Sequence, residues 1–128
     1  MQNEHGEYSI SVVGKTVIVE LVGAWNLNTS LSAKDHYINT VNQMHFDKFA
    51  VFLDFSRWEL AEKEVFEVFK SIATWSDQHS QKYLVFIPGM TIHNYVMEDV
   101  FNVLEQCEVY IAKCKKDGFN YLKRKHML

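Results

Sequence analysis

The sequence predicts a single α/β domain, residues 1–128, with a mixed, mostly parallel sheet of about five strands; three observations support this. Residues 49–56 form an apolar run with a single acid near its carboxyl end, typical of a strand buried on both faces. Two strand patterns precede it, joined by Gly14 and Lys15 at a hairpin turn. After it, helical and strand patterns alternate, which indicates parallel strands joined by right-handed crossovers.

The predicted elements follow the order β-β-α-β-α-β-α-β-α. The predicted strands occupy residues 8–13, 16–22, 49–56, 83–87 and 108–112. The predicted helices occupy about residues 30–44, 62–79 and 94–106, followed by a short last helix capped by Asp117. The helices are recognised by apolar residues at helical spacing, and residues 56–60 are predicted to be a loop.

Composition excludes several classes of protein. A hydrophobic content of 48% indicates a packed core and not a disordered chain. No apolar run approaches the ~20 residues of a membrane span. Residues 1–7 are polar and acidic, unlike a signal peptide, so we predict a cytoplasmic protein. Cys107 and Cys114 are predicted to be reduced thiols.

Charge is distributed unevenly along the chain. Residues 113–128 hold six lysine or arginine residues against one aspartate, a net charge of +5, which leaves −8 for residues 1–112. We interpret the basic segment as a solvated last helix with its cations near the negative end of the helix dipole. Contact with nucleic acid or anionic lipid is the alternative, but six charges form no long basic stripe, so no nucleic-acid partner is predicted.

The sequence contains no catalytic constellation. Its six histidines show no zinc-ligand spacing, and Ser56 lacks the surroundings of a hydrolase nucleophile. Asp54 is interpreted as a strand-end acid bonded to loop amides or to Arg57, with an activated carboxylate as the alternative. We therefore predict no catalytic residue, no metal and no cofactor, and a protein that is not an enzyme.

The element order, the segment Val19–Ala24 that ends the second strand, and Val51–Ser56 at the centre resemble the STAS domain. This family includes bacterial anti-sigma-factor antagonists and the cytoplasmic tails of sulfate transporters. A related STAS-like family of small bacterial proteins fits equally well. The resemblance implies strands in sequential order, helices mainly on one face, and a regulatory or protein-interaction role.

Antagonists of the STAS family carry a phosphorylatable serine at the start of the helix after the central strand, in a pattern like Asp-Ser-x-Gly. The corresponding pair here is Glu62 and Lys63, with neither serine nor glycine in the pattern. Glu59 and Glu64 add negative charge that repels a phosphate. We therefore predict a module without this phosphoserine switch.

Ligands of open α/β sheets bind at the carboxyl ends of the strands. The residues predicted at that edge as candidate ligand contacts are Trp25, Arg57, Trp58 and Met90. The simplest interpretation of the two tryptophans is that they cap the core. The alternative function is a carrier that holds a small apolar ligand or lipid in a pocket near Trp25 and Trp58.

Strand alternation places Phe52, Phe86 and Tyr110 on the face that the crossover helices leave open. That face is mostly apolar, so the first helix, the last helix or a second copy of the chain must cover it. We predict a homodimer with these three residues at the interface, and a protein partner or a second copy as the binding partner.

Overall fold

The structure is a computed structural model that describes residues 4–128, so the first three residues of the polar amino-terminal segment lie outside it. The strands are β1 (Glu7–Val13), β2 (Thr16–Trp25), β3 (Phe49–Ala61), β4 (Gln81–Ile87) and β5 (Glu108–Ile111). The helices are α1 (Leu27–Asn42), α2 (Lys63–Gln78), α3 (Thr91–Val96), α4 (Glu98–Phe101) and α5 (Lys115–Arg124).

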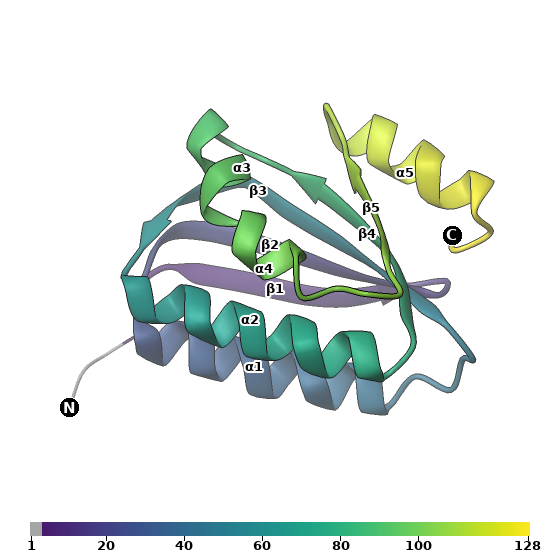
Figure 1. Cartoon of the computed structure of the whole chain (residues 1–128), viewed down its shortest axis with the longest axis horizontal. Helices are drawn as coiled ribbons and strands as arrows, with labels where there is room; N and C mark the ends of the chain where they lie inside the picture. The colour runs from purple at the N-terminus through teal and green to yellow at the C-terminus, as the bar shows by residue number, and fades with distance from the viewer. Residues whose placement is uncertain (1–3) are drawn as a thin grey trace.

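The five strands form one sheet in the order β1-β2-β3-β4-β5, which confirms the mixed sheet with sequential strands. β1 is antiparallel to β2, and every later pair is parallel. Figure 1 shows α1 and α2 side by side along one side of the sheet, and α5 on the other side. The central position of β3 explains why its sequence is apolar on both faces.

The first hydrophobic core lies between the sheet and the helices α1, α2 and α4. Alternate residues of β2, including Val17 and Leu21, face it together with Phe55 of β3. The helices contribute residues such as Val65, which is fully buried. This core fixes the crossover helices on one face, as the sequence predicts.

The second core lies on the opposite face, under α5. Phe52 and Val85 of the sheet pack there with Leu122 of α5. A Cβ atom at Gly118 would lie 2.7 Å from Phe52 Cε2 and 2.8 Å from a Val85 methyl carbon, so glycine allows the helix to approach the sheet closely. The last helix is therefore the cover that the second face requires.

The segment after α5 ties the end of the chain to the first hairpin. The carbonyl oxygen of Met127 accepts hydrogen bonds from the Lys15 amide, at 2.9 Å, and from the Thr16 hydroxyl, at 2.8 Å. Both Thr16 and Met127 are buried. These two bonds anchor the second core at the turn of the hairpin.

Several predicted boundaries are wrong. β3 continues to Ala61 through the predicted loop 56–60, because these residues pair with the carboxyl half of β2. The predicted helix 94–106 is replaced by the two short helices α3 and α4. The N-cap of α5 is Cys114 and not Asp117, whose carboxylate instead accepts a hydrogen bond from the Lys113 amide at 3.0 Å.

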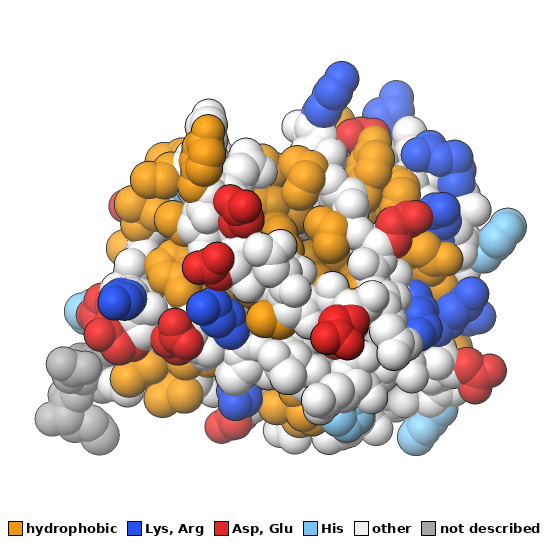
Figure 2. Space-filling model, in the orientation of Figure 1, with side chains coloured by type: hydrophobic (Ala, Val, Ile, Leu, Met, Phe, Trp, Pro, Cys, Tyr) orange, Lys and Arg blue, Asp and Glu red, His pale blue; other side chains and the backbone are white. Residues whose placement is uncertain are grey.

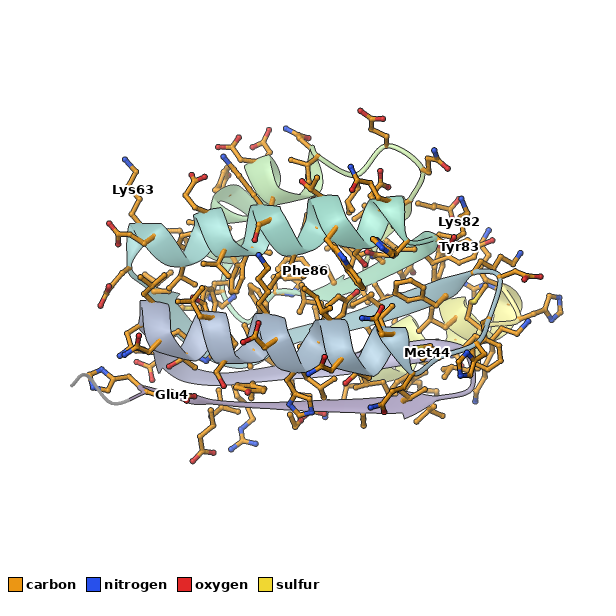
Figure 3. All side chains as sticks on the ribbon, turned by 90° about the horizontal axis from the view of Figure 1, so that it is seen from below. Glu4, Met44, Lys63, Lys82, Tyr83 and Phe86 are labelled. Atoms are coloured by element: carbon orange, nitrogen blue, oxygen red, sulfur yellow. The ribbon has the colours of Figure 1, made fainter. Side chains whose placement is uncertain are left out.

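The predicted alternation of β4 is wrong by one residue. Phe86 packs in the first core, with its ring centroid 4.9 Å from that of Phe55, whereas Val85 and Ile87 face α5. In the view of Figure 3, from the side of α1 and α2, Phe86 is seen between the two helices. Residues 83–87 are apolar throughout, so their sequence carries no period-two signal that would assign the faces.

No helix among residues 4–128 combines the length and the apolar character that a membrane span requires.

Candidate functional site

The end of β3 projects beyond its neighbour β4 at the carboxyl edge of the sheet. Here Arg57 pairs with Val22 of β2, and Trp58 pairs with Gly23. Trp58 is buried, whereas Arg57 and Glu59 on either side of it are exposed. Residues 56–60, which we predicted to form a loop, therefore belong to a strand.

His93 in α3 attaches the loop after β4 to this extension of β3. Its Nδ1 atom accepts hydrogen bonds from the amides of Gly89, at 2.9 Å, and Met90, at 3.2 Å. The ring hydrogen is therefore on Nε2, which donates to the Glu59 carbonyl at 2.8 Å. His93 is fully buried, so the contact holds α3 against β3 as one unit.

Sequence reasoning missed His93 because it searched the histidines for metal-ligand spacing. The signal that indicates its role is a histidine in the first turn of a helix, shortly after the strand-ending Pro88 and Gly89. At that position the imidazole ring can accept hydrogen bonds from backbone amides before the helix, as a capping side chain would. A Cβ atom at Gly89 would lie 2.3 Å from the Phe55 carbonyl oxygen, so the loop also requires a glycine to pack against β3.

Beneath this contact lies a cluster of aromatic rings. The rings of Trp25 and Trp58 meet edge to face, with their centroids 6.4 Å apart. The Trp58 centroid also lies 4.5 Å from the ring centroid of Phe55 and 5.3 Å from that of His93. The structure thus brings the two predicted tryptophans together, with both buried. Trp25 Nε1 donates to the Glu7 carbonyl at 3.1 Å, whereas Trp58 Nε1 has no partner among the described residues.

Large apolar side chains are exposed around the buried His93. Leu60 is 42% exposed, Met90 42%, Ile92 45% and Tyr95 71%. We call these four residues the carboxyl-edge patch. Figure 2 shows hydrophobic side chains on the surface of the molecule around α3. Exposed apolar side chains that gather on a rigid support are typical of a contact surface.

Acidic residues border the patch at the start of α2. Glu59, Glu62 and Glu64 are exposed. Glu62 is the N-cap of α2 but makes no capping hydrogen bond through its side chain. The first residue of the helix is Lys63, and residues 59–64 contain no serine.

Asp54 is occupied by contacts within the chain. Its Oδ1 atom accepts a hydrogen bond from the Ser56 amide at 2.8 Å. Because β3 continues to Ala61, Asp54 lies within the strand and not, as we predicted, at its end. Its Oδ2 atom lies 3.7 Å from Lys115 Nζ of α5, so the nearby cation is Lys115 and not Arg57. Within residues 4–128, no cluster of three metal-ligating side chains occurs.

A small cavity lies in the first core between the sheet and the helices α1 and α2. Its volume is about 100 Å³, and its lining is almost wholly apolar. Trp25 lines it, but Arg57, Trp58 and Met90 do not. Tyr37 on its wall pairs with the Ser76 hydroxyl at 2.6 Å, and burial raises the pKa of this tyrosine.

The three predicted interface residues do not share one exposed face. Phe52 and Phe86 are fully buried on opposite faces of the sheet, and Tyr110 is half-buried beside α5. A homodimer stays a prediction, but Phe52 and Phe86 offer no surface to a second copy in this structure.

The basic segment contributes to the fold as well as to the surface. Lys115 lies 3.4 Å from Glu20, and Lys125 lies 3.3 Å from Glu108. Figure 2 shows lysine and arginine side chains gathered at the end of the molecule that α5 occupies. The cations of α5 that face outward, such as Lys116 and Lys123, are exposed.

Neither the scan against protein-family models nor the search of curated proteins finds a match for this chain. Solved structures do match. One is an uncharacterised protein of the DUF3478 family from Shewanella loihica PV-4, described as having a SpoIIAA-like fold, with a TM-score of 0.70 and 8% identity over 95% of this chain and 97% of that chain. The anti-sigma factor antagonist SpoIIAA in its unphosphorylated form has a TM-score of 0.69 and 9% identity, over 95% of this chain and 100% of that chain.

An anti-sigma factor antagonist from Mycobacterium paratuberculosis also matches, with a TM-score of 0.63 and 11% identity over 93% of this chain and 95% of that chain. At such low identities the matches establish the fold alone. This chain has the STAS-like fold of SpoIIAA.

Proposed function

We propose that this protein is a non-catalytic regulatory module that binds a partner protein through the carboxyl-edge patch. The observation that carries the proposal is the patch itself, four exposed apolar residues on strand and helix segments that His93 holds together. Two structurally similar proteins are named anti-sigma factor antagonists, which supports a protein as the partner.

The surroundings of the patch define the chemistry of that partner. The apolar side chains of the patch favour an apolar anchor on the partner, since a few well-packed anchor residues supply most of the binding energy of an interface. The acids Glu59, Glu62 and Glu64 at the border favour basic residues around that anchor. Two side chains often used in catalysis, His93 and Asp54, are occupied by contacts within the chain, which supports a non-catalytic role.

Affinity capture from the native host tests this function. Ile92→Glu introduces a charge within the patch, and Leu31→Glu introduces the same charge at an equally exposed leucine of α1, since the two side chains are 45% and 44% exposed. We expect the wild-type chain and Leu31→Glu to retain the same stoichiometric protein, and Ile92→Glu to lose it. Retention of the partner by the wild-type chain and by both variants would contradict the assignment of the patch.

The cavity in the first core supports a second candidate, a carrier of a small apolar ligand. An apolar cavity of about 150 Å³ in another protein binds benzene, so a volume of about 100 Å³ suits only a small ligand or part of a longer chain. Trp25 would contact the ligand, whereas Trp58 would remain beneath the patch.

Native mass spectrometry distinguishes the two candidates. A carrier purified from its host should retain a small molecule, and Ala33→Leu should displace it by filling the cavity that Ala33 lines. A binding module should have the mass of the chain alone or of a complex with protein. A co-purified molecule that Ala33→Leu still retains would exclude this cavity as its site.

A further inference from the structure

β1 is the longer of the two edge strands of the sheet. It spans 7 residues, whereas β5 at the opposite edge spans 4. Figure 3 shows β1 as the outermost strand, with no described helix or strand beyond it. We propose that the free edge of β1 pairs antiparallel with β1 of a second copy, so that one sheet continues through a dimer. This proposal concerns a different surface from the carboxyl-edge patch.

The edge of β1 lacks the features that keep exposed strands apart. Natural edge strands are blocked by lysine, proline, bulges or a covering element. β1 contains neither lysine nor proline, and it pairs with β2 residue by residue from Glu7 to Val13 without a bulge. Val12 and Val13 are also exposed, although both are apolar. The edge is therefore open to another strand.

The hairpin turn determines which backbone groups of β1 are free. The two-residue turn at Gly14 and Lys15 makes Val13 and Thr16 a hydrogen-bonded pair. Hydrogen-bonded and non-hydrogen-bonded pairs alternate along an antiparallel ladder. The N–H and C=O groups of Tyr8, Ile10 and Val12 therefore point to the free edge.

The sequence of β1 is complementary to itself about Ile10. When Ile10 lies opposite Ile10 of the second copy, Tyr8 lies opposite Val12 and Ser9 lies opposite Ser11. The three residues with free backbone groups then face one another and exchange hydrogen bonds. Apolar side chains meet on the face that carries α1, and serine hydroxyls meet on the other face.

The charges of β1 do not oppose this register. With Ile10 at the centre, Glu7 lies opposite the uncharged Val13 of the second copy. No two like charges lie directly opposite each other between residues 7 and 13, because Glu7 is the one charged residue of that segment. A strand from an unrelated protein would not require this symmetry, so the second copy is the favoured occupant.

Light scattering at micromolar concentration tests the dimer. The wild-type chain should have twice the mass of the 15.0 kDa monomer. Val12→Pro removes a backbone donor that points away from β2, so it should give a monomer that melts within a few degrees of the wild-type chain. Val12→Thr keeps the donor and the β-branched shape, and it should remain a dimer. A wild-type monomer, or a dimer unaffected by Val12→Pro, overturns the proposal.

Disulfide trapping tests the register, even if Val12→Pro fails to fold. In a background of Cys107→Ser and Cys114→Ser, a Ser9→Cys chain is mixed with a Ser11→Cys chain and oxidised. Directly opposed residues of a non-hydrogen-bonded pair lie about 4.5 Å apart, within the range of a disulfide. We expect a covalent dimer in the mixture and none in either chain alone. No crosslink in the mixture, or crosslinks in the separate chains, overturns this interface and leaves the partner-capture result unaffected.

Discussion

His93 is a buried polar side chain whose ring nitrogens both have partners. Its three hydrogen bonds join two backbone amides of the loop after β4 to a backbone carbonyl of β3. Buried polar groups stabilise a protein only when they are paired, and a lost partner leaves the others unsatisfied. The geometry of the carboxyl-edge patch therefore depends on this one side chain.

Replacing His93 with phenylalanine should destabilise the protein by on the order of 3 kcal/mol. The new ring has a similar size but leaves the Gly89 and Met90 amides and the Glu59 carbonyl unpaired. Urea denaturation measures the difference. His45→Phe, at an exposed position, is the control and should change stability little. Equal stability of the two variants would show that the His93 hydrogen bonds contribute nothing.

Hydrogen bonds between residues close together in the sequence are easier to predict than bonds between distant residues. The bond from the Ser56 amide to Asp54 joins residues two positions apart, so a bond from this acid to a nearby amide could be predicted, although its place within β3 could not. The bond from His93 to Glu59 spans 34 positions and ends on a backbone oxygen. Because every residue has such an oxygen, no residue type identifies this partner in advance.

Among the elements, α5 is held to β5 by two tyrosine–carboxylate hydrogen bonds. The Tyr121 hydroxyl donates to Glu108, and the Tyr110 hydroxyl donates to Asp117 at 2.8 Å. The two tyrosine rings stack with their centroids 4.3 Å apart. The hydrogen bond from Tyr121 lowers the pKa of Glu108, and the Lys113 amide followed by the Tyr110 hydroxyl lowers the pKa of Asp117.

These pKa shifts predict that the attachment of α5 weakens in acid. A carboxylate whose pKa is lower in the folded state stabilises that state fully above its unfolded pKa, which is 4.5 for glutamate. The stabilisation is lost as the pH falls through the folded values. Hydrogen exchange is measured at pH 7 and at pH 3 and corrected for intrinsic rates. The amides of α5 should lose more protection between the two pH values than the amides of α2.

The control for the acid experiment is a double variant, Glu108→Gln with Asp117→Asn, which keeps the shape of both side chains and removes their charges. Its α5 should already be less protected at neutral pH and should change less on acidification. If the variant and the wild-type chain lose protection in parallel, other carboxylates determine the acid sensitivity.

The elements that sequence reasoning misplaced lie where periodicity is weak. The faces of β4 are reversed because residues 83–87 are all apolar. The third crossover was predicted as one helix over residues 94–106 but consists of the short helices α3 and α4, and Val109 and Ile111 of β5 are 37% and 48% exposed. By contrast, α2 follows a clear apolar stripe, and its predicted range of 62–79 differs by one residue at each end from Lys63–Gln78.

For the whole molecule, the sheet separates two hydrophobic cores of different construction. The first core is closed by α1, α2 and α4, whereas the second is closed by α5 and the segment after it. Element order alone predicts that the second face needs a cover, but it does not choose between a helix and a second copy. That choice depends on how closely α5 approaches the sheet at Gly118, which is a property of the folded chain.

Deletion of residues 113–128 should expose the second face of the sheet. Phe52 and Val85 would lose their contacts with α5, so the truncated chain should bind a hydrophobic dye, melt at a lower temperature and aggregate. A Lys116→Ala and Lys123→Ala double variant is the control, because it removes exposed charges of α5 and keeps its apolar face. A truncated chain as stable and monodisperse as this control would show that α5 is dispensable.

The bonds between Met127 and the first hairpin join residues that a ribosome synthesises far apart in time. Thr16 is synthesised early, but its hydroxyl can donate to the Met127 carbonyl only after another 111 residues have been added. Synthesis at about 5–20 residues per second leaves the apolar second face uncovered until α5 has emerged. Nascent chains that stall between residues 112 and 127 would therefore be the natural clients of chaperones that bind apolar strands.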